Sequence, residues 1–248
     1  MIDRFVYLAM NGAKQSMLKQ EVVTQNLANV NTTAFKSQLD VFSAAPAFGD
    51  NAMQTRTFSV EETVGTDFTS CPTITTGRDL DAAIQSKGWF SVQAPDGTEA
   101  YTRDGNFQIG PDGVLRSNTG MAILGEGGPI TIPPSAKINI GTDGTISITQ
   151  AGIANAVQVM GRLKLVNPDE KNIIRGSDGL FRMKDGQPAQ PDQNVKVASG
   201  MIEGSNVNMI ENLVSMISLS KQYDINMKLI QTADQNSRAT SQLLNLSA

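Results

Sequence analysis

The sequence contains no histidine and a single cysteine, Cys71. Without an imidazole, one chain cannot build a Ser-His-Asp or Cys-His nucleophile, or a zinc or non-haem iron site with histidine ligands. A lone thiol also excludes an intrachain disulfide and a thiolate cluster. We expect Cys71, which precedes Pro72, to be a small buried or connecting residue, and we expect no cofactor or metal.

Charged residues are scarce, at 18% of the 248 residues against about 25% in typical globular domains. The net charge is -4, and Lys and Arg form no run along the chain. The basic surface that binds a phosphate backbone is therefore missing, and we do not expect nucleic acid as a partner. Polarity is carried instead by Ser, Thr, Asn and Gln.

Long hydrophobic runs are absent as well. The apolar stretch 5–10 is short, follows Asp3 and is stopped by Asn11 and Gly12. It predicts neither a secretory signal nor a membrane-spanning helix. We expect no direct membrane insertion, and a protein that is cytoplasmic or exported without a cleaved signal peptide.

Glycine and proline are both missing from residues 206–248, which predicts a long C-terminal helix. Asn208, followed three residues later by Glu211, resembles a capping box at its start. Ile210, Val214 and Ile217 widen an apolar stripe that recurs every three, four or seven residues. The stripe that we expect to form an interface consists of Met209, Leu213, Met216, Tyr223, Met227 and Ile230.

The N-terminal segment repeats this pattern less strongly and predicts a second helix that ends near Asn29 to Asn31, where side chains compete for backbone hydrogen bonds. An isolated amphipathic helix is marginal in water, so we expect the two ends to pack on each other or on other copies. The charges of the C-terminal segment sum to zero, so many copies can pack without repulsion. The N-terminal interface is predicted to be Ile2, Val6, Ala9, Ala13, Val23, Leu27 and Val30.

The middle of the chain has a different pattern. Asp-Gly pairs, which favour tight hairpins because both residues tolerate positive φ, begin at Asp96, Asp104, Asp112, Asp143, Asp178 and Asp185. Between them lie β-rich runs at 89–94, 106–110, 130–132, 137–140, 145–149 and 162–166. We predict an α+β fold with four parts: an N-terminal helix at 1–34, an extended connector with one hairpin at 35–75, an antiparallel β domain at 76–204, and a C-terminal helix at 205–248.

Three motifs suggest other chemistry, and each has an ordinary structural explanation. Two Ser-x-x-Lys spacings, at Ser16 and Ser218, lack the Lys-Thr-Gly and Ser-Asp-Asn elements of serine acylases. The glycine-rich segment 125–128 lacks the ending of a phosphate-binding loop. The Asp-Gly pairs match neither an EF-hand nor a calcium-binding β-roll. We therefore expect an assembly subunit rather than an enzyme.

Three segments resemble the bacterial flagellar rod and hook proteins. The segment 25–36 resembles their N-terminal signature, 101–107 with 112–113 and 120–125 resembles their β domain, and 205–208 with Glu211, Tyr223 and 232–234 resembles their C-terminal helix. The family commonly has glycine where Ala34 stands; if that site needs positive φ, alanine costs roughly 1 kcal/mol. The motif residues are Asn26, Leu27, Ala28, Asn29, Asn31, Thr32, Phe35, Lys36, Asn206 and Val207.

The resemblance implies paired terminal helices in the inner layer of a flagellar rod, with the β domain outside them. It also implies type III export, a periplasmic position in the basal body, and helical assembly with other copies and other rod subunits into a drive shaft. Segments 125–131 and 161–166 are most similar to those of proximal rod members, and distal rod members are the alternative. A β-type binding or adhesion module stays open as a third possibility, and an enzyme as a fourth.

Overall fold

The computed structural model describes the backbone of residues 2–46, 57–133, 136–150 and 157–246; side chains at 2–5, 40–64, 136, 150 and 240–246 lie outside that description. The chain forms two compact units, Met1–Val30 with Ser37–Asp67 and Val207–Ala248, and Asn31–Lys36 with Phe68–Asn206. Over the described ranges, neither helix has the length of apolar sequence that crossing a bilayer requires. The expected α+β class is confirmed.

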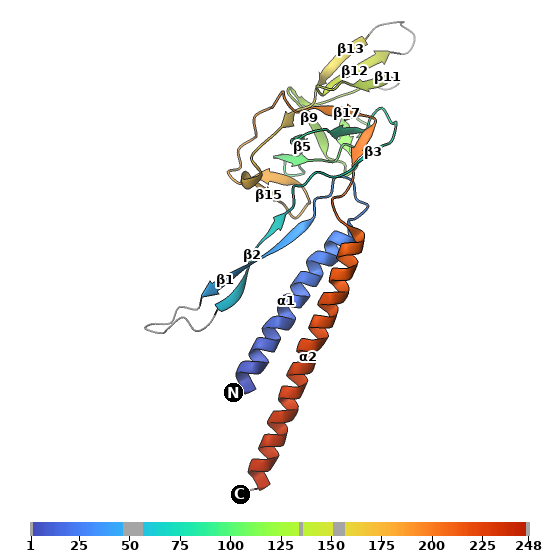
Figure 1. Cartoon of the computed structure of the whole chain (residues 1–248). Coiled ribbons are helices and arrows are strands. Elements are labelled where there is room, and N and C mark those ends of the chain that lie inside the picture. The colour runs from blue at the N-terminus through green and yellow to red at the C-terminus, as the bar shows by residue number, and fades with distance from the viewer. Residues whose placement is uncertain (1, 47–56, 134–135, 151–156, 247–248) are drawn as a thin grey trace. The chain divides into compact units, whose positions relative to one another are not determined.

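The first unit contains both long helices, α1 (Ile2–Ala28) and α2 (Met209–Leu246), and the antiparallel pair β1 (Gln38–Pro46) and β2 (Thr57–Thr66). The helices lie side by side along the length of α1 (Figure 1). α2 begins at Met209, four residues after the predicted start at residue 205. The predicted capping residue Asn208 caps it, because its Oδ1 accepts from the N–H groups of Ile210 at 3.1 Å and Glu211 at 3.4 Å.

The second unit is antiparallel β-structure. Its largest sheet has the order β15-β16-β6-β5-β9-β8-β7, with β10 on β9 and β14 on β5. A three-stranded sheet β11-β12-β13 and the pairs β17-β4 and β18-β3 complete the described strands. Their bounds are β3 (Thr73–Thr75), β4 (Ala82–Ile84), β5 (Trp89–Gln93), β6 (Glu99–Thr102), β7 (Phe107–Ile109), β8 (Leu115–Ser117), β9 (Ala122–Gly125), β10 (Gly128–Pro129), β11 (Ala136–Ile140), β12 (Thr145–Gln150), β13 (Val157–Arg162), β14 (Leu165–Val166), β15 (Ile173–Arg175), β16 (Phe181–Met183), β17 (Val197–Ser199) and β18 (Met201–Glu203), with a short 3-10 helix η1 (Glu170–Asn172) before β15.

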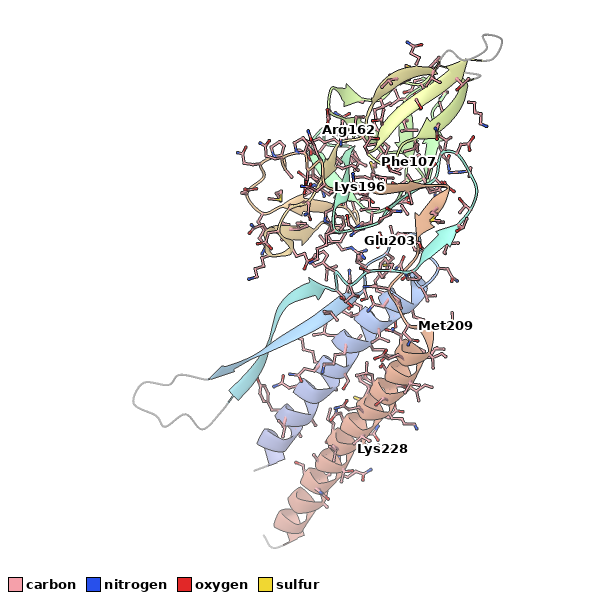
Figure 2. The ribbon with its side chains drawn as sticks, turned by 45° about the horizontal axis from the view of Figure 1, so that its top comes forward. Phe107, Arg162, Lys196, Glu203, Met209 and Lys228 are labelled. Carbon is pink, nitrogen blue, oxygen red and sulfur yellow. The ribbon has the colours of Figure 1, made fainter. Side chains whose placement is uncertain are left out.

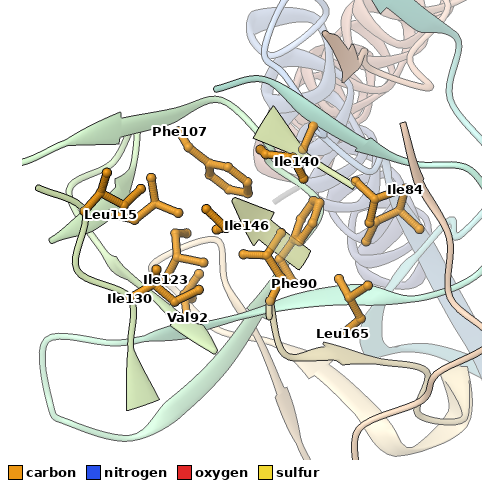
Figure 3. Close-up of a cluster of buried hydrophobic side chains, with 14 of the residues drawn as sticks. Ile84, Phe90, Val92, Phe107, Leu115, Ile123, Ile130, Ile140, Ile146 and Leu165 are labelled. Atoms are coloured by element: carbon orange, nitrogen blue, oxygen red, sulfur yellow. The ribbon is translucent and has the colours of Figure 1, made fainter. Parts of the chain in front are cut away.

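One apolar core joins the largest sheet to the three-stranded sheet. Phe90 and Phe107 meet edge to face with ring centroids 5.2 Å apart, and isoleucines of β11 and β12 pack against them (Figure 3). A second, aromatic cluster contains Trp89, Tyr101, Val166, Ile173 and Phe181. The expectation that Trp89 is a core residue is confirmed, since it is 4% exposed.

The Asp-Gly turns differ from the prediction in two ways. In five pairs only the glycine has positive φ, between 69° and 81°, while the Asp side chain accepts a hydrogen bond from the backbone N–H two residues on, as Asp96 does from Thr98 at 3.0 Å. Gly105 has no positive φ; it is required because a Cβ there would overlap the carbonyl group of Ala82. The Asp104-Gly105 pair was therefore predicted as a turn, whereas its glycine is needed for the close approach to the Ala82 backbone.

Two predicted strands are wrong. Residues 130–132 form no ladder and make only an isolated bridge between Thr131 and Val114. Residues 162–166 are divided, because β13 ends at Arg162 in the three-stranded sheet whereas β14 pairs with β5 in the largest sheet. A segment that passes between two sheets cannot keep one continuous ladder.

Candidate assembly interface and motif cluster

Small side chains line the face of α1 that meets α2. Ala9, Ala13 and Ser16 are buried at 2–7% exposure. Gly12 lies on the same face, and a Cβ there would stand 3.1 Å from the side-chain amide of Asn226. Small residues allow the two helix backbones to approach closely, so this seam holds α1 and α2 together within one chain.

Two residues of the predicted N-terminal interface, Ala9 and Ala13, lie in this seam. Ala9 and Ala13 are buried, while Val6, Val23, Leu27 and Val30 are half-buried. The side chain of Ile2 lies outside the described residues. On α2, the predicted residues Met216, Tyr223, Met227 and Ile230 are half-buried, whereas Met209 and Leu213 are 45% and 38% exposed.

A second apolar strip on α2 is exposed. Ile210, Val214, Ile217 and Ile225 are 74%, 62%, 54% and 59% exposed. Because an α-helix rotates by about 100° per residue, these four side chains lie on one face of α2. This face points roughly 160° away from the half-buried face that contains Leu219. We call these four residues the α2 strip. It is available for contacts outside the chain, and Leu8, Met10 and Met17 of α1 are exposed as well.

The motif residue Asn26 connects α1 to the start of β1. Its side chain is 5% exposed, Nδ2 donates to the Gln38 carbonyl at 3.0 Å, and Oδ1 accepts from the Gln38 N–H at 2.9 Å. This reciprocal pair imitates one rung of a β-ladder. Asn29 acts locally, because its Nδ2 donates to the Gln25 carbonyl at 2.8 Å.

The motif residues Asn31, Thr32, Phe35, Lys36 and Asn206 belong to the second unit. We predicted a helical segment extending to residue 34, but α1 ends at Ala28. Lys36 is 2% exposed, and its Nζ donates to Glu203 Oε1 at 2.8 Å, to the Thr69 carbonyl at 2.7 Å and to Cys71 Sγ at 3.3 Å. Glu203 accepts a second charged bond at Oε2 from Arg103 Nη1 at 3.0 Å. Lys36, Thr69, Cys71, Arg103 and Glu203 form what we call the Lys36 cluster, with Glu203 on β18 (Figure 2).

The aromatic and cationic neighbours shield this cluster. The Arg103 guanidinium lies 5.6 Å from the Trp89 ring centroid, and that of Arg175 lies 4.7 Å from the Phe35 ring. Arg175 Nη1 also donates to the Lys36 carbonyl at 3.2 Å. Burial lowers the pKa of Arg175 and raises the pKa of the Cys71 thiol, against the opposing effect of Lys36. Cys71 is therefore a packed thiol with little thiolate character.

The backbone beside Lys36 is strained. Ala34 has φ +57° and is the one non-glycine residue with positive φ in the described ranges. Its N–H donates to the Glu203 carbonyl at 2.8 Å, and the Asn206 N–H donates to the Phe35 carbonyl at 3.4 Å. These bonds hold Ala34 in the left-handed region that favours glycine.

The sequence identified Lys36, Phe35 and Asn206 as motif residues but assigned them no contacts. It assigned no role to Glu203, the last residue of β18, or to Arg103, which directly follows β6. The available signals were that Arg103 lies within the family-like segment 101–107 and that Glu203 lies just before the 205–208 motif.

Three family profiles match the chain. "Flagella basal body rod protein" matches residues 7–36, "Flagellar hook protein FlgE/F/G D1 domain" matches 83–148, and "Flagellar basal body rod FlgEFG protein C-terminal" matches 198–243. The first match covers most of α1 with the motif, and the third covers the end of the β domain with most of α2.

Relatives match over nearly the whole chain. Flagellar basal-body rod protein FlgF of Salmonella typhimurium (strain LT2) and that of Escherichia coli (strain K12) are each 40% identical over 253 residues, covering 99% of this chain and 100% of the relative. Flagellar basal-body rod protein FlgG of Buchnera aphidicola subsp. Schizaphis graminum is 33% identical over 260 residues, covering 96% and 98%. The chain therefore belongs to the FlgF family of flagellar basal-body rod proteins, which are structural components and not enzymes.

Proposed function

We propose that this chain is a subunit of the proximal rod and assembles helically with its neighbours through α1 and α2. The observation that carries the proposal is the α2 strip, whose four aliphatic side chains are all more than half exposed. Monomeric proteins rarely leave an ordered apolar row of this kind uncovered. A neighbouring subunit with the same kind of helices has the matching chemistry, because the charges of α2 sum to zero and add no repulsion.

The strip is too small to hold two subunits together alone. Fully burying one Ile or Val contributes about 1.5–3 kcal/mol, so covering the exposed part of four such residues contributes about 4–7 kcal/mol. Association costs about 4–15 kcal/mol in lost freedom. A single contact of this size leaves the subunit monomeric, whereas a helical lattice engages several faces of one subunit at once. This balance suits a subunit that must stay unassembled until it reaches the growing rod.

The predicted interface residues then divide into two roles. Ala9 and Ala13 of α1, with half-buried Tyr223 and Met227 of α2, hold the two helices of one chain together. Exposed Met209 and Leu213 join the α2 strip in contacting neighbours. Both sets are engaged in the assembled rod, which gives the rod its stiffness.

The assembly has further consequences for location and partners. The partners are other copies of this chain, other proximal rod subunits and the distal rod protein, and the rod transmits torque as a drive shaft across the periplasm. The subunit reaches the rod through the flagellar type III export apparatus without cleavage of a signal peptide. Membership of the flagellar basal-body rod family supports a place in the rod.

A place in the distal rod is the second candidate, because an FlgG relative is 33% identical over 96% of the chain. Imaging basal bodies that carry a labelled subunit separates the two. A label near the inner membrane ring supports the proximal position, and one along the outer part of the rod supports the distal position.

A truncation tests whether the helices are needed for assembly. Removing residues 209–248 eliminates α2 and leaves Asn206, whose Nδ2 donates to Thr69 Oγ1 at 3.2 Å in the second unit. The shortened chain should keep folded β-structure and be absent from purified basal bodies. Normal incorporation would refute the assignment of assembly to α2, and leave a β-type binding module as the better explanation.

A point substitution tests the α2 strip itself. Ile217→Glu places a charge in the strip, and Gln222→Glu places the same charge at an exposed polar position of the same helix. Both should leave the purified subunit folded, as measured by circular dichroism. We expect Ile217→Glu to abolish incorporation and swimming in cells lacking the native chain, and Gln222→Glu to reduce them much less. Equal effects would show that the strip is not a specific interface.

A further inference from the structure

The chain passes between its two units four times, at residues 30/31, 36/37, 67/68 and 206/207. Inside the second unit, the segments next to these crossings are 31–36, 68–71 and 203–206. All three segments contribute to the Lys36 cluster or bond directly to it. The covalent connections of the β domain to the helical unit therefore converge on one cluster of the β domain, whose central pair, Lys36 and Glu203, is buried.

The three segments are bonded to one another as well as to the strands. Ala34 N–H donates to the Glu203 carbonyl at 2.8 Å, and Cys71 Sγ lies 3.7 Å from the Phe35 carbonyl that also accepts from Asn206 N–H. Lys36 Nζ donates all three of its hydrogen bonds to groups of segments 68–71 and 203–206. Opening any one segment consequently breaks bonds to both of the others.

The ionic centre makes opening costly. The side chains of Lys36 and Glu203 are 1% and 3% exposed, and that of Arg103 is 10% exposed. Separating a buried carboxylate from two cations leaves groups that water reaches only after the segments part. Pulling along the chain thus meets a short-range, all-or-none resistance rather than a gradual loss of apolar contact.

We propose that the Lys36 cluster is a mechanical fastener, which makes the entry and exit segments of the β domain open together and only after the Lys36–Glu203 bond breaks. The proposal rests on the proposed function for the source of the force, since torque that passes between the helices and the β domain along the chain arrives at these segments. Loss of a simple stabilising ion pair would lower the stability of the whole β domain equally. Loss of a fastener would free only the entry and exit segments and leave the core of the β domain folded.

Hydrogen exchange on the purified chain separates these possibilities. Glu203→Gln keeps the volume of the side chain and removes its charge, and the matched control Glu170→Gln removes the charge of an exposed pair with Lys87 at 2.7 Å. We expect Glu203→Gln to speed exchange of the Ala34 and Asn206 amides at least about tenfold, with the amides of β5 unchanged. Equal acceleration in β5, or no acceleration relative to Glu170→Gln, would overturn the proposal.

Force spectroscopy provides the second measurement and needs no rod. With handles on both chain ends, pulling first separates α1 from α2 and then loads the segments 31–36 and 203–206. In the Glu170→Gln control we expect one abrupt extension for the β domain. In Glu203→Gln the segments should detach earlier, in a separate event, about tenfold faster at the same force. An unchanged single event would refute the fastener while leaving the role in rod assembly untouched.

Discussion

Replacing Ala34 with glycine should stabilise the β domain. Ala34 has φ +57°, and an L-residue in the left-handed region costs about 1–2 kcal/mol, whereas glycine occupies that region freely. Glycine also lowers the free energy of unfolding by about 0.4–1 kcal/mol, because an unfolded chain with glycine has more conformations. The free energy of unfolding should therefore rise by about 0.5–1 kcal/mol. The hydrogen bond from residue 34 to the Glu203 carbonyl is a backbone bond and is kept.

Urea unfolding followed by tryptophan fluorescence measures this effect, because Trp89 is the sole tryptophan and lies in the aromatic cluster of the β domain. With a slope of about 2 kcal/mol per molar urea, the midpoint should rise by about 0.2–0.5 M. The control Ala198→Gly on β17 should lower the midpoint, since glycine within a strand costs stability. An unchanged or lower midpoint for Ala34→Gly, at constant slope, would show that the strain is not stored at this residue.

Three further substitutions test other parts of the structure. Burial raises the pKa of Asp104, so the contribution of this carboxyl group to stability is complete below the unfolded pKa near 3.8 and is lost as the pH rises through the folded pKa. In Asp104→Asn, the amide Oδ1 keeps both bonds that Asp104 Oδ1 accepts. The urea midpoint of Asp104→Asn should therefore exceed that of the wild type at pH 7 but not at pH 3. Asn26→Ala removes both bonds to Gln38 and should speed exchange of the Gln38 amide, while Asn29→Ala leaves that amide protected. Ala9→Glu buries a charge in the helix seam and should lower the helical circular dichroism signal, whereas Lys14→Glu at an exposed position of the same helix leaves it unchanged; equal signals would contradict the seam.

Local signals predicted much of the fold. The absence of glycine and proline from 206–248 and the Asn208 cap predict α2, because helix formation depends on neighbouring residues. Five of the six Asp-Gly pairs form turns with positive φ at glycine, for the same reason. The strand predicted at 162–166 was wrong because this segment passes from the three-stranded sheet to the largest sheet. The strand predicted at 130–132 was wrong because its tertiary surroundings allow only an isolated bridge to Val114.

The prediction for the ends of the chain was less complete. Apolar periodicity identifies a stripe on each helix. It does not distinguish a stripe that packs against the other helix of the same chain from one that contacts a neighbouring copy, because both have the same period. The structure separates them by burial: Ala9 and Ala13 lie in the seam, whereas Ile210 and Val214 are exposed. Side-chain size, rather than hydrophobicity, decides which face of α1 allows close approach of the backbones.

The sequence by itself determined the class of the protein and its family, because helix periodicity, turn residues and motif segments are each encoded within short stretches. Through the family resemblance it also pointed to Ala34, the one non-glycine residue with positive φ in the described ranges. Only the tertiary structure decided what the motif does. Lys36 and Glu203 are 167 positions apart, and no local pattern specifies that pairing. They meet because β18 returns beside the segment that leaves α1, and a buried charge in that place must find its partner or remain unsatisfied.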